Sequence, residues 1–327
     1  MNARSRDLLN TSPKGVFKQF PEFSKLTIND REKYESVAKD LPPLSDLGFP
    51  TLMFWWNSLD ACAVSELNGN LVISYWMPGM EDVSGLSLVG SSDVEQSICE
   101  IFDWQASQGA RPMITHVPEF VISRVEHPDM FLCTPEREFD EYIYRISDFY
   151  PLANIDVVRR KRLGAFLRAT TGKSVTIRSI NLTEPDNVRT LLDAVDSWRQ
   201  TDRLNESVAM ERDSIRVAIK DHAALGIRNL CIFVDGELQG FCLYYVSADG
   251  KYAVITNGRA NTLYVGTFEY GFCMFAGVFQ EDGMDFINME SDLGSQYMRS
   301  LKLALGPADY FRKYKLEPAY ASEVVLR

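Results

Sequence analysis

Histidine is scarce in this sequence, and its three copies, His116, His127 and His222, fall in three separate predicted elements. No HExxH, HxH or Gly-x-Ser-x-Gly pattern occurs, which argues against the familiar zinc-hydrolase and serine-hydrolase sites. The six cysteines stand far apart with no CxxC pair, as is typical of reduced cysteines that pack in a core. We therefore expect structural or surface histidines, no metal site and no required cofactor.

Long apolar runs are also missing. No segment is apolar over the length that a membrane-spanning helix needs, and the N-terminal "MNARSRDLLNTSPKG" lacks the apolar core of a secretory signal. The chain has 327 residues, of which 46% are hydrophobic and 24% charged, a composition typical of a globular protein with room for two domains. The sequence thus predicts no transmembrane segment and a cytoplasmic location.

Positive charge is scarce in the first half only. Residues 1–150 contain 12 Lys or Arg against 23 Asp or Glu, whereas residues 151–327 contain 22 of each, and the net charge is -11. A protein this acidic is a poor general ligand for nucleic acids or anionic lipids. The second half nevertheless has enough cations for a local basic surface.

Hydrophobic periodicity and turn residues predict the same order of elements in both halves. Asn68-Gly69 and Asp235-Gly236 each join two β-rich runs, as in tight hairpins. A further strand, a helix and another strand follow each hairpin, and a helix precedes it. We predict a mixed α/β fold of two similar units, residues 1–150 and 151–327, with a bridging helix at about 155–171.

The bridging helix is strongly basic. It carries Arg159, Arg160, Lys161, Arg162 and Arg168, while its apolar residues are spaced to form a stripe that packs on a core. One interpretation is a solvated helix that pairs with acidic groups of the first half. The other is an anion site for the phosphates of a nucleotide, a lipid headgroup or a tRNA end, since arginine suits phosphate geometry.

The segment "NMESDLGSQYMRSLK", residues 288–302, combines a predicted strand end with a predicted helix start near Glu290 and Asp292. Ligands commonly bind where strands end and helices begin in α/β folds. The charges of Asp292, Arg299 and Lys302 therefore form a candidate site. The alternative is structural, with Asp292 as the N-cap of the helix and the cations on its solvent face.

This segment, extended to Pro307, resembles the C-terminal domain of phosphatidylglycerol lysyltransferases: Asn-x-Glu-x-Asp-x-Gly, four residues, Arg, two residues, Lys and a later Pro. "FDEYIYRISDFYPLANIDVVRRKRLGAF" and "LTINDREKYES…FPTLMFWW" are similar to other parts of that family, so the likeness covers nearly the whole chain. Two features depart from it. The family's Lys-Arg-Asn is Arg159-Arg160-Lys161 here, and the membrane-spanning half is missing.

The resemblance implies a tandem GNAT-type acyltransferase fold and transfer of an aminoacyl or acyl group onto an amine or hydroxyl. The donor would be an aminoacyl-tRNA or an acyl-CoA, and the acceptor a small molecule or a lipid headgroup. On this basis Asp292, Glu290 and Lys302 are the candidate catalytic residues. The candidate substrate-binding residues are Asn288, Arg299, Arg159, Arg160 and Arg162.

Two other functions are open at this stage. An acyl-CoA-dependent N-acyltransferase would use the same fold, although no pyrophosphate-binding loop of that class is evident in the sequence. A non-catalytic binding or regulatory module would keep the fold and lose the reaction, which the altered Arg159-Arg160-Lys161 motif and the missing membrane half favour. The sequence does not predict an oligomeric state.

Overall fold

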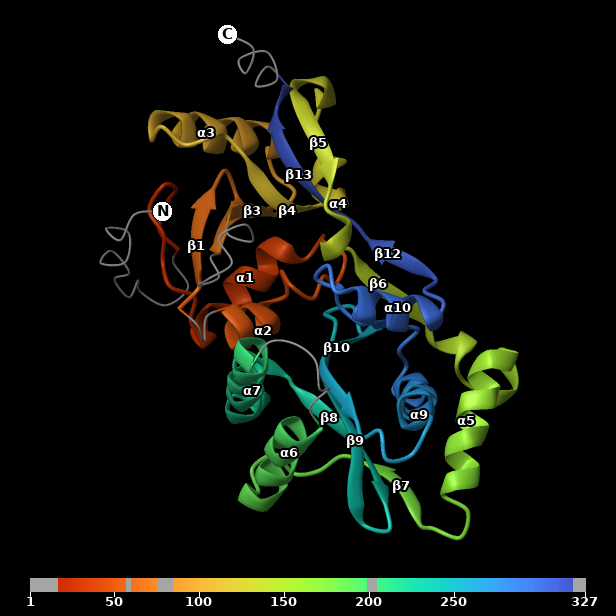
Figure 1. Cartoon of the computed structure of the whole chain (residues 1–327). Coiled ribbons are helices and arrows are strands. Elements are labelled where there is room, and N and C mark those ends of the chain that lie inside the picture. The colour runs from red at the N-terminus through yellow and green to blue at the C-terminus, as the bar shows by residue number, and fades with distance from the viewer. Residues whose placement is uncertain (1–16, 57–59, 76–84, 199–204, 320–327) are drawn as a thin grey trace. The chain divides into compact units, whose positions relative to one another are not determined.

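The computed structural model describes residues 17–56, 60–75, 85–198 and 205–319. It divides into two compact units, each assembled from separate stretches of chain (Figure 1). Unit 1 comprises residues up to Glu141 together with Ser291–Ser295 and the chain from Phe311 onward. Unit 2 comprises Tyr142–Glu290 and Gln296–Tyr310.

Unit 1 is built from two three-stranded sheets, ordered β1-β2-β3 and β4-β13-β5. Its elements are α1 (Arg31–Ala38), α2 (Phe49–Thr51), β1 (Cys62–Leu67), β2 (Asn70–Tyr75), β3 (Gly85–Val89), α3 (Val94–Ser107), β4 (Ile114–Pro118), α4 (Glu119–Ile122), β5 (Phe131–Pro135) and β13 (Lys313–Pro318). The apolar stripe of α3, which includes Ile98, Ile101 and Phe102, packs with β2, β3 and β4 into one hydrophobic cluster. All pairings within the two sheets are antiparallel.

Unit 2 is built on a seven-stranded sheet ordered β12-β6-β11-β10-β9-β8-β7. Its elements are β6 (Glu141–Arg145), α5 (Val157–Ala169), β7 (Val175–Arg178), α6 (Pro185–Ser197), α7 (Asn205–Lys220), α8 (His222–Leu225), β8 (Arg228–Val234), β9 (Glu237–Val246), β10 (Tyr252–Ala260), α9 (Thr267–Glu281), β11 (Phe286–Asn288), α10 (Gln296–Ala304) and β12 (Asp309–Phe311). Helices α5 and α9 lie on one side of the central strands, and α6 and α7 lie on the other (Figure 1). The α9 side holds the main core, in which Phe272, Phe275 and Phe279 are buried.

The two hairpins expected from sequence are present. At Asn68-Gly69 and Asp235-Gly236 both residues of each pair have positive φ, as a primed two-residue turn requires. The helix expected at the end of "NMESDLGS" starts later than Asp292, since α10 begins at Gln296. All six cysteines are free, and four of them are buried.

The units exchange strands. Strand β6 follows β5 of unit 1 in the chain but pairs with β11 in the sheet of unit 2. Strand β13 follows unit 2 in the chain but lies between β4 and β5 in unit 1. The chain therefore passes between the units at three short segments, and one of these, residues 288–295, carries the candidate residues Asn288, Glu290 and Asp292.

Candidate functional site

The candidate site in unit 2 lies where two parallel strands separate. Strands β10 and β11 pair over three residues only, from Tyr252 opposite Phe286 to Val254 opposite Asn288. Strand β11 then ends, whereas β10 continues to Ala260 alongside β9. Both strands therefore present their C-terminal ends on the same edge, which is where α/β sheets commonly bind ligands.

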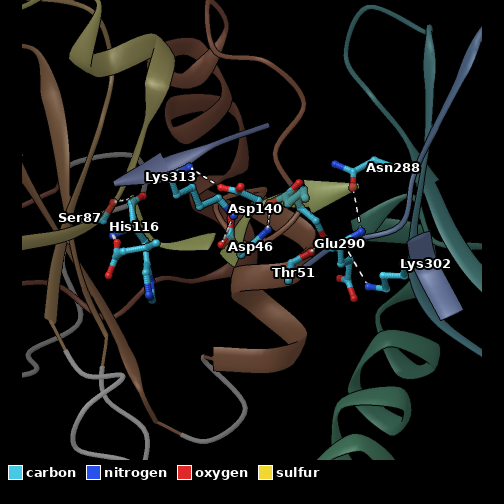
Figure 2. A network of polar contacts seen from close by, with 12 residues as sticks. Asp46, Thr51, Ser87, His116, Asp140, Asn288, Glu290, Lys302 and Lys313 are labelled. Carbon is cyan, nitrogen blue, oxygen red and sulfur yellow. Dashed lines mark hydrogen bonds and ion pairs between the residues drawn. The ribbon is translucent and has the colours of Figure 1, made fainter. Parts of the chain in front are cut away.

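Glu290 follows β11 directly, and its main chain is held at both ends. The Asn288 side-chain oxygen accepts a hydrogen bond from the Glu290 N–H at 2.8 Å. The Glu290 carbonyl accepts from the Tyr142 N–H at 3.2 Å. It also accepts from the Lys302 ammonium at 3.2 Å (Figure 2). These contacts hold Glu290 at φ 57°, a left-handed conformation that costs a non-glycine residue about 1–3 kcal/mol.

Lys302 is buried, with only 3% of its surface exposed. Its ammonium donates to the Met289 carbonyl at 2.6 Å as well as to Glu290, and it lies 5.6 Å from the centre of the Tyr142 ring. Lysine is almost never fully buried without such partners. Lys302 therefore holds the main chain of the turn after β11 in place. Arg299 lies one helical turn before Lys302 on α10.

Asp292 belongs to unit 1 and forms a local turn. Its side-chain oxygen Oδ1 accepts from the Gly294 N–H at 2.9 Å, and its carbonyl accepts from the Ser295 N–H. Its second oxygen, Oδ2, lies 3.6 Å from the Arg137 guanidinium, and the side chain is fully buried. The alternative role for Asp292, as N-cap of the helix, is wrong, because Leu293 and Gly294 are left-handed and the helix begins only at Gln296.

The three candidate arginines of α5, which has four in all, each contact unit 2 itself. Arg159 donates to the Leu305 carbonyl just after α10, and it stacks 4.4 Å from the centre of the Phe149 ring. Arg160 donates to the Ile155 carbonyl at 3.1 Å, and Arg162 is paired with Glu269. Arg159 thus supports the end of the helix that carries Lys302.

Asn257, on β10, is a candidate that sequence reasoning missed. A β-bulge interrupts the pairing of β10 with β9 between Ile255 and Asn257, just beyond the last residue paired with β11. Asn257 is 5% exposed, and its buried Nδ2 has no hydrogen-bond partner in the part of the chain that the structure describes. An unpaired buried donor is unusual and marks a place where a carbonyl oxygen could bind. The "ITN" sequence has no motif that would have indicated it.

His116 forms a second polar cluster, within unit 1. It is buried with φ 54°, and its ring stacks on Tyr75 and packs against Phe139. Its backbone N–H donates to the Glu136 carboxylate at 2.6 Å. Burial lowers the pKa of His116 to about 3, with a contribution from nearby Lys313, so the ring is neutral. Burial also raises the pKa of Glu136 to about 7. The histidine is therefore a packed core residue beside a carboxyl that titrates near neutrality.

A buried ion network lies at the start of β13 in unit 1. The Lys313 ammonium contacts Asp46 and lies 2.7 Å from Glu141, and the Lys313 N–H donates to Asp140 (Figure 2). Burial alone lowers the pKa of Lys313, but the carboxylates of Asp46 and Glu141 outweigh it and raise the pKa above its ordinary value. Glu141 also accepts from the Ser45 N–H at 2.8 Å. This network fastens the exchanged strand to the N-terminal part of unit 1.

Within the described ranges, no group of three or more His, Cys, Asp or Glu side chains is placed to hold a metal ion. Every helix in those ranges is too short or too polar to cross a bilayer.

Solved structures show the same fold. A conserved protein of unknown function from Bacteroides thetaiotaomicron VPI-5482 is 21% identical, with a TM-score of 0.73 over 90% of this chain and 98% of that one. The C-terminal domain of a candidate lysylphosphatidylglycerol synthetase from Agrobacterium fabrum is 13% identical, with a TM-score of 0.59 over 92% of this chain and 96% of that one. L-PGS from Bacillus licheniformis is 14% identical, with a TM-score of 0.57 over 89% of this chain and 92% of that one. The predicted mixed α/β fold is confirmed, and the chain forms two compact units.

No curated protein sequence matches the chain. The model of one family, described as "Phosphatidylglycerol lysyltransferase, C-terminal", matches residues 50–315. That range covers most of the chain and includes β10, β11, Glu290 and Lys302 as well as the basic helix α5. The chain therefore belongs to the phosphatidylglycerol lysyltransferase C-terminal family, as its sequence resemblance indicated.

Proposed function

We propose that the protein transfers an acyl or aminoacyl group from an activated donor to an amine or hydroxyl acceptor, at the separated ends of β10 and β11. One observation carries the proposal: Glu290 is held in a costly left-handed conformation by Asn288, Tyr142 and Lys302 at the position where α/β sheets bind ligands. Backbone strain of this kind accumulates at functional sites. The family match supports the same class of reaction.

In the proposed reaction the acceptor nitrogen or oxygen attacks the carbonyl carbon of the donor, and the bond from that carbon to its leaving oxygen or sulfur breaks. Glu290 takes the proton that the acceptor loses and returns it to the leaving atom. The Asn257 amide donates to the carbonyl oxygen as negative charge develops there. Both residues are half or more buried, so competing water is reduced.

Other candidate residues act through position and charge in this proposal. Lys302 and Asn288 set the main chain of Glu290, while Arg299 supplies positive charge from α10. Asp292 and Arg137 brace the turn that follows Glu290. Arg159 supports the end of α10, and Arg160 and Arg162 remain candidate contacts for a phosphate-bearing donor.

The test is a transfer assay on the purified full chain. Radiolabelled aminoacyl-tRNA and, separately, radiolabelled acetyl-CoA are offered with primary amines and alcohols as acceptors. Glu290→Gln keeps every main-chain contact and should lower kcat about 100-fold or more, the usual size of a general-base contribution, at an unchanged thermal midpoint. The matched control is Glu281→Gln, at the exposed end of α9, which should have no effect.

Two results would count against the proposal. Full activity of Glu290→Gln would remove Glu290 from the reaction. Absence of transfer from both donors, with no saturable binding of either, would favour a non-catalytic module that has kept the fold. Saturable acetyl-CoA binding with transfer would identify the donor class as acyl-CoA.

A further inference from the structure

The two sheets of unit 1 meet at β3 and β4, which lie side by side but belong to different sheets (Figure 1). Over the described length of both strands, side chains join them instead of a ladder of main-chain hydrogen bonds. The Ser87 hydroxyl on β3 donates to the His116 carbonyl on β4 at 3.1 Å (Figure 2). The hydroxyl of Tyr75, at the end of β2, contacts the hydroxyl of Thr115 on β4. Polar groups are therefore gathered inside unit 1 where its two sheets divide.

His116 is set into this division by a β-bulge. Thr115 and His116 together lie opposite Lys315 of β13, and His116 has the left-handed φ of 54°. Bulges re-aim a side chain, and left-handed residues other than glycine gather at functional sites. His116 is 6% exposed, and its hydrogen bonds with Ser87 and Glu136 both use its main chain. The fold thus places the imidazole in the interior without using its nitrogens.

The two ring nitrogens of His116 are polar atoms that need partners. Among the described residues, neither nitrogen forms a hydrogen bond. The ring is neutral, so one nitrogen is a donor and the other is an acceptor. Buried polar atoms of native proteins are nearly always hydrogen-bonded. The imidazole therefore indicates a ligand that carries polar groups of its own.

Aromatic rings surround this histidine. The His116 ring stacks on Tyr75 with the ring centroids 4.9 Å apart, and it also packs against Phe139. The Trp56 ring lies 5.5 Å from the Tyr75 ring, at the end of the π-helix Leu52–Trp56. π-Helical turns are rare and often occur at functional sites. Trp56 and Phe139 are only half-buried, so a ligand can reach their rings from solvent.

Two carboxylates lie near the same rings. One oxygen of Glu136 accepts from the His116 main chain, and Oδ2 of Asp46 contacts the Lys313 ammonium. The other Asp46 oxygen, Oδ1, is buried and has no hydrogen-bond partner within the described ranges. Burial raises the pKa of the Tyr75 hydroxyl well above its ordinary value, and the charges of Glu136 and Asp46 raise this pKa further. Both carboxylates are therefore close enough to act on a charge beside Tyr75.

We propose that this cluster binds a small organic amine as its alkylammonium ion. The cluster, which we call the unit 1 amine site, consists of Asp46, Trp56, Tyr75, His116, Glu136 and Phe139. Aromatic ring faces attract an organic cation, and a partly desolvated carboxylate adds a charge-assisted hydrogen bond. A hydroxyl or carbonyl of the same ligand pairs with the His116 imidazole.

Other classes of ligand fit this cluster less well. A metal ion needs several ligands around one point, and no group of three or more His, Cys, Asp or Glu side chains in the described ranges is so placed. A phosphate would need a free cation or an open helix N-terminus. The N-terminus of α3, which follows β3, is closed by Asn70, whose side-chain oxygen accepts from the Ser92 N–H at 3.0 Å.

The test titrates the full chain at pH 8, where the Glu136 carboxyl, with a pKa of about 7, is mostly ionised. The probes are 4-amino-1-butanol and 1,4-butanediol, an uncharged compound of similar length. Calorimetry measures binding, and nitrogen NMR follows the histidine rings. The sequence has three histidines, so the signals that His116→Gln removes belong to His116. The amine should bind saturably and shift these signals, and the diol should bind at least about tenfold more weakly.

Variants then identify the groups that hold the amine. Glu136→Gln keeps an acceptor for the His116 main chain and should weaken amine binding at least about tenfold. Trp56→Leu should weaken it at least about threefold. The matched control is Glu126→Gln, at an exposed carboxyl of unit 1, which should bind the amine like the unaltered chain. Thermal midpoints measured alongside report correct folding.

Three results with the unaltered chain would overturn the proposal: no saturable binding of the amine, equal binding of amine and diol, or amine binding that leaves the His116 ring signals unchanged. Undiminished amine binding by Glu136→Gln would do the same. The titration contains no acyl donor, so its outcome is independent of the transferase proposal.

Discussion

Replacement of Lys302 by methionine tests whether this lysine holds the turn at Glu290. Methionine fills similar volume but cannot donate to the Met289 and Glu290 carbonyls, at present 2.6 and 3.2 Å from the ammonium. Each hydrogen bond from a charged donor contributes about 1.5–3 kcal/mol, and removal of a buried ammonium recovers part of its desolvation cost. We expect the free energy of unfolding to fall by about 2–4 kcal/mol.

Urea unfolding followed by fluorescence measures this loss, and Trp198 is the one tryptophan of the sequence that lies in unit 2. Hydrogen exchange then locates it, because the amides of Glu290 and Tyr142 should exchange faster once the turn loosens. Lys220→Met, at an exposed position, should change stability by less than about 0.5 kcal/mol. Unchanged stability and exchange in Lys302→Met would refute the view that Lys302 positions Glu290.

Two further substitutions probe the packing of α5 and the His116 cluster. Gly266→Ala should lower the free energy of unfolding by about 3 kcal/mol or more, because the added Cβ meets the Arg162 carbonyl. Gly236 is also left-handed but has open space around it, so Gly236→Ala should cost about 1 kcal/mol. Equal decreases in the thermal midpoints of the two variants would contradict the close approach at Gly266. The Glu136 carboxyl has its pKa raised from 4.5 to about 7, so its ionisation destabilises the folded chain as pH rises between those values. Glu136→Gln keeps an acceptor for the His116 backbone N–H. It should raise the free energy of unfolding by about 1–3 kcal/mol at pH 8, and this gain should vanish near pH 4.5. A difference in stability that does not change with pH would show that the pKa of the carboxyl is not raised.

Local features of the fold could be predicted from the sequence. The turns at Asn68-Gly69 and Asp235-Gly236 depend on adjacent residues that tolerate positive φ, and both occur where expected. The long apolar pattern of "TLYVGTFEYGFCMFAGVFQ" predicts a buried helix from Thr262, and α9 is present but begins later, at Thr267 after the left-handed Gly266. Strand β5 was missed because it is short and mostly exposed, so its pattern does not alternate as a half-buried strand should.

Features that depend on distant parts of the chain could not be predicted. The partners of Lys313 lie at Asp46 and Glu141, and no local pattern connects them. Glu290 and Lys302 are candidates from the strand-end pattern and from the family resemblance. The left-handed conformation of Glu290 depends on its contacts with Asn288 and Tyr142, which no local pattern predicts. The roles assigned to these residues stay predictions.

The exchanged strand β13 sets an order of events for synthesis. Unit 1 needs Lys313 between Asp46 and Glu141, and it needs β13 between β4 and β5, so its second sheet cannot close while the ribosome is still making unit 2. Until then the facing edges of β4 and β5 are open to wrong partners. If the chain were divided between β6 and α5 and the two parts were expressed separately, the first part would lack β13, which lies between β4 and β5. The second part would lack β6, which pairs with β11.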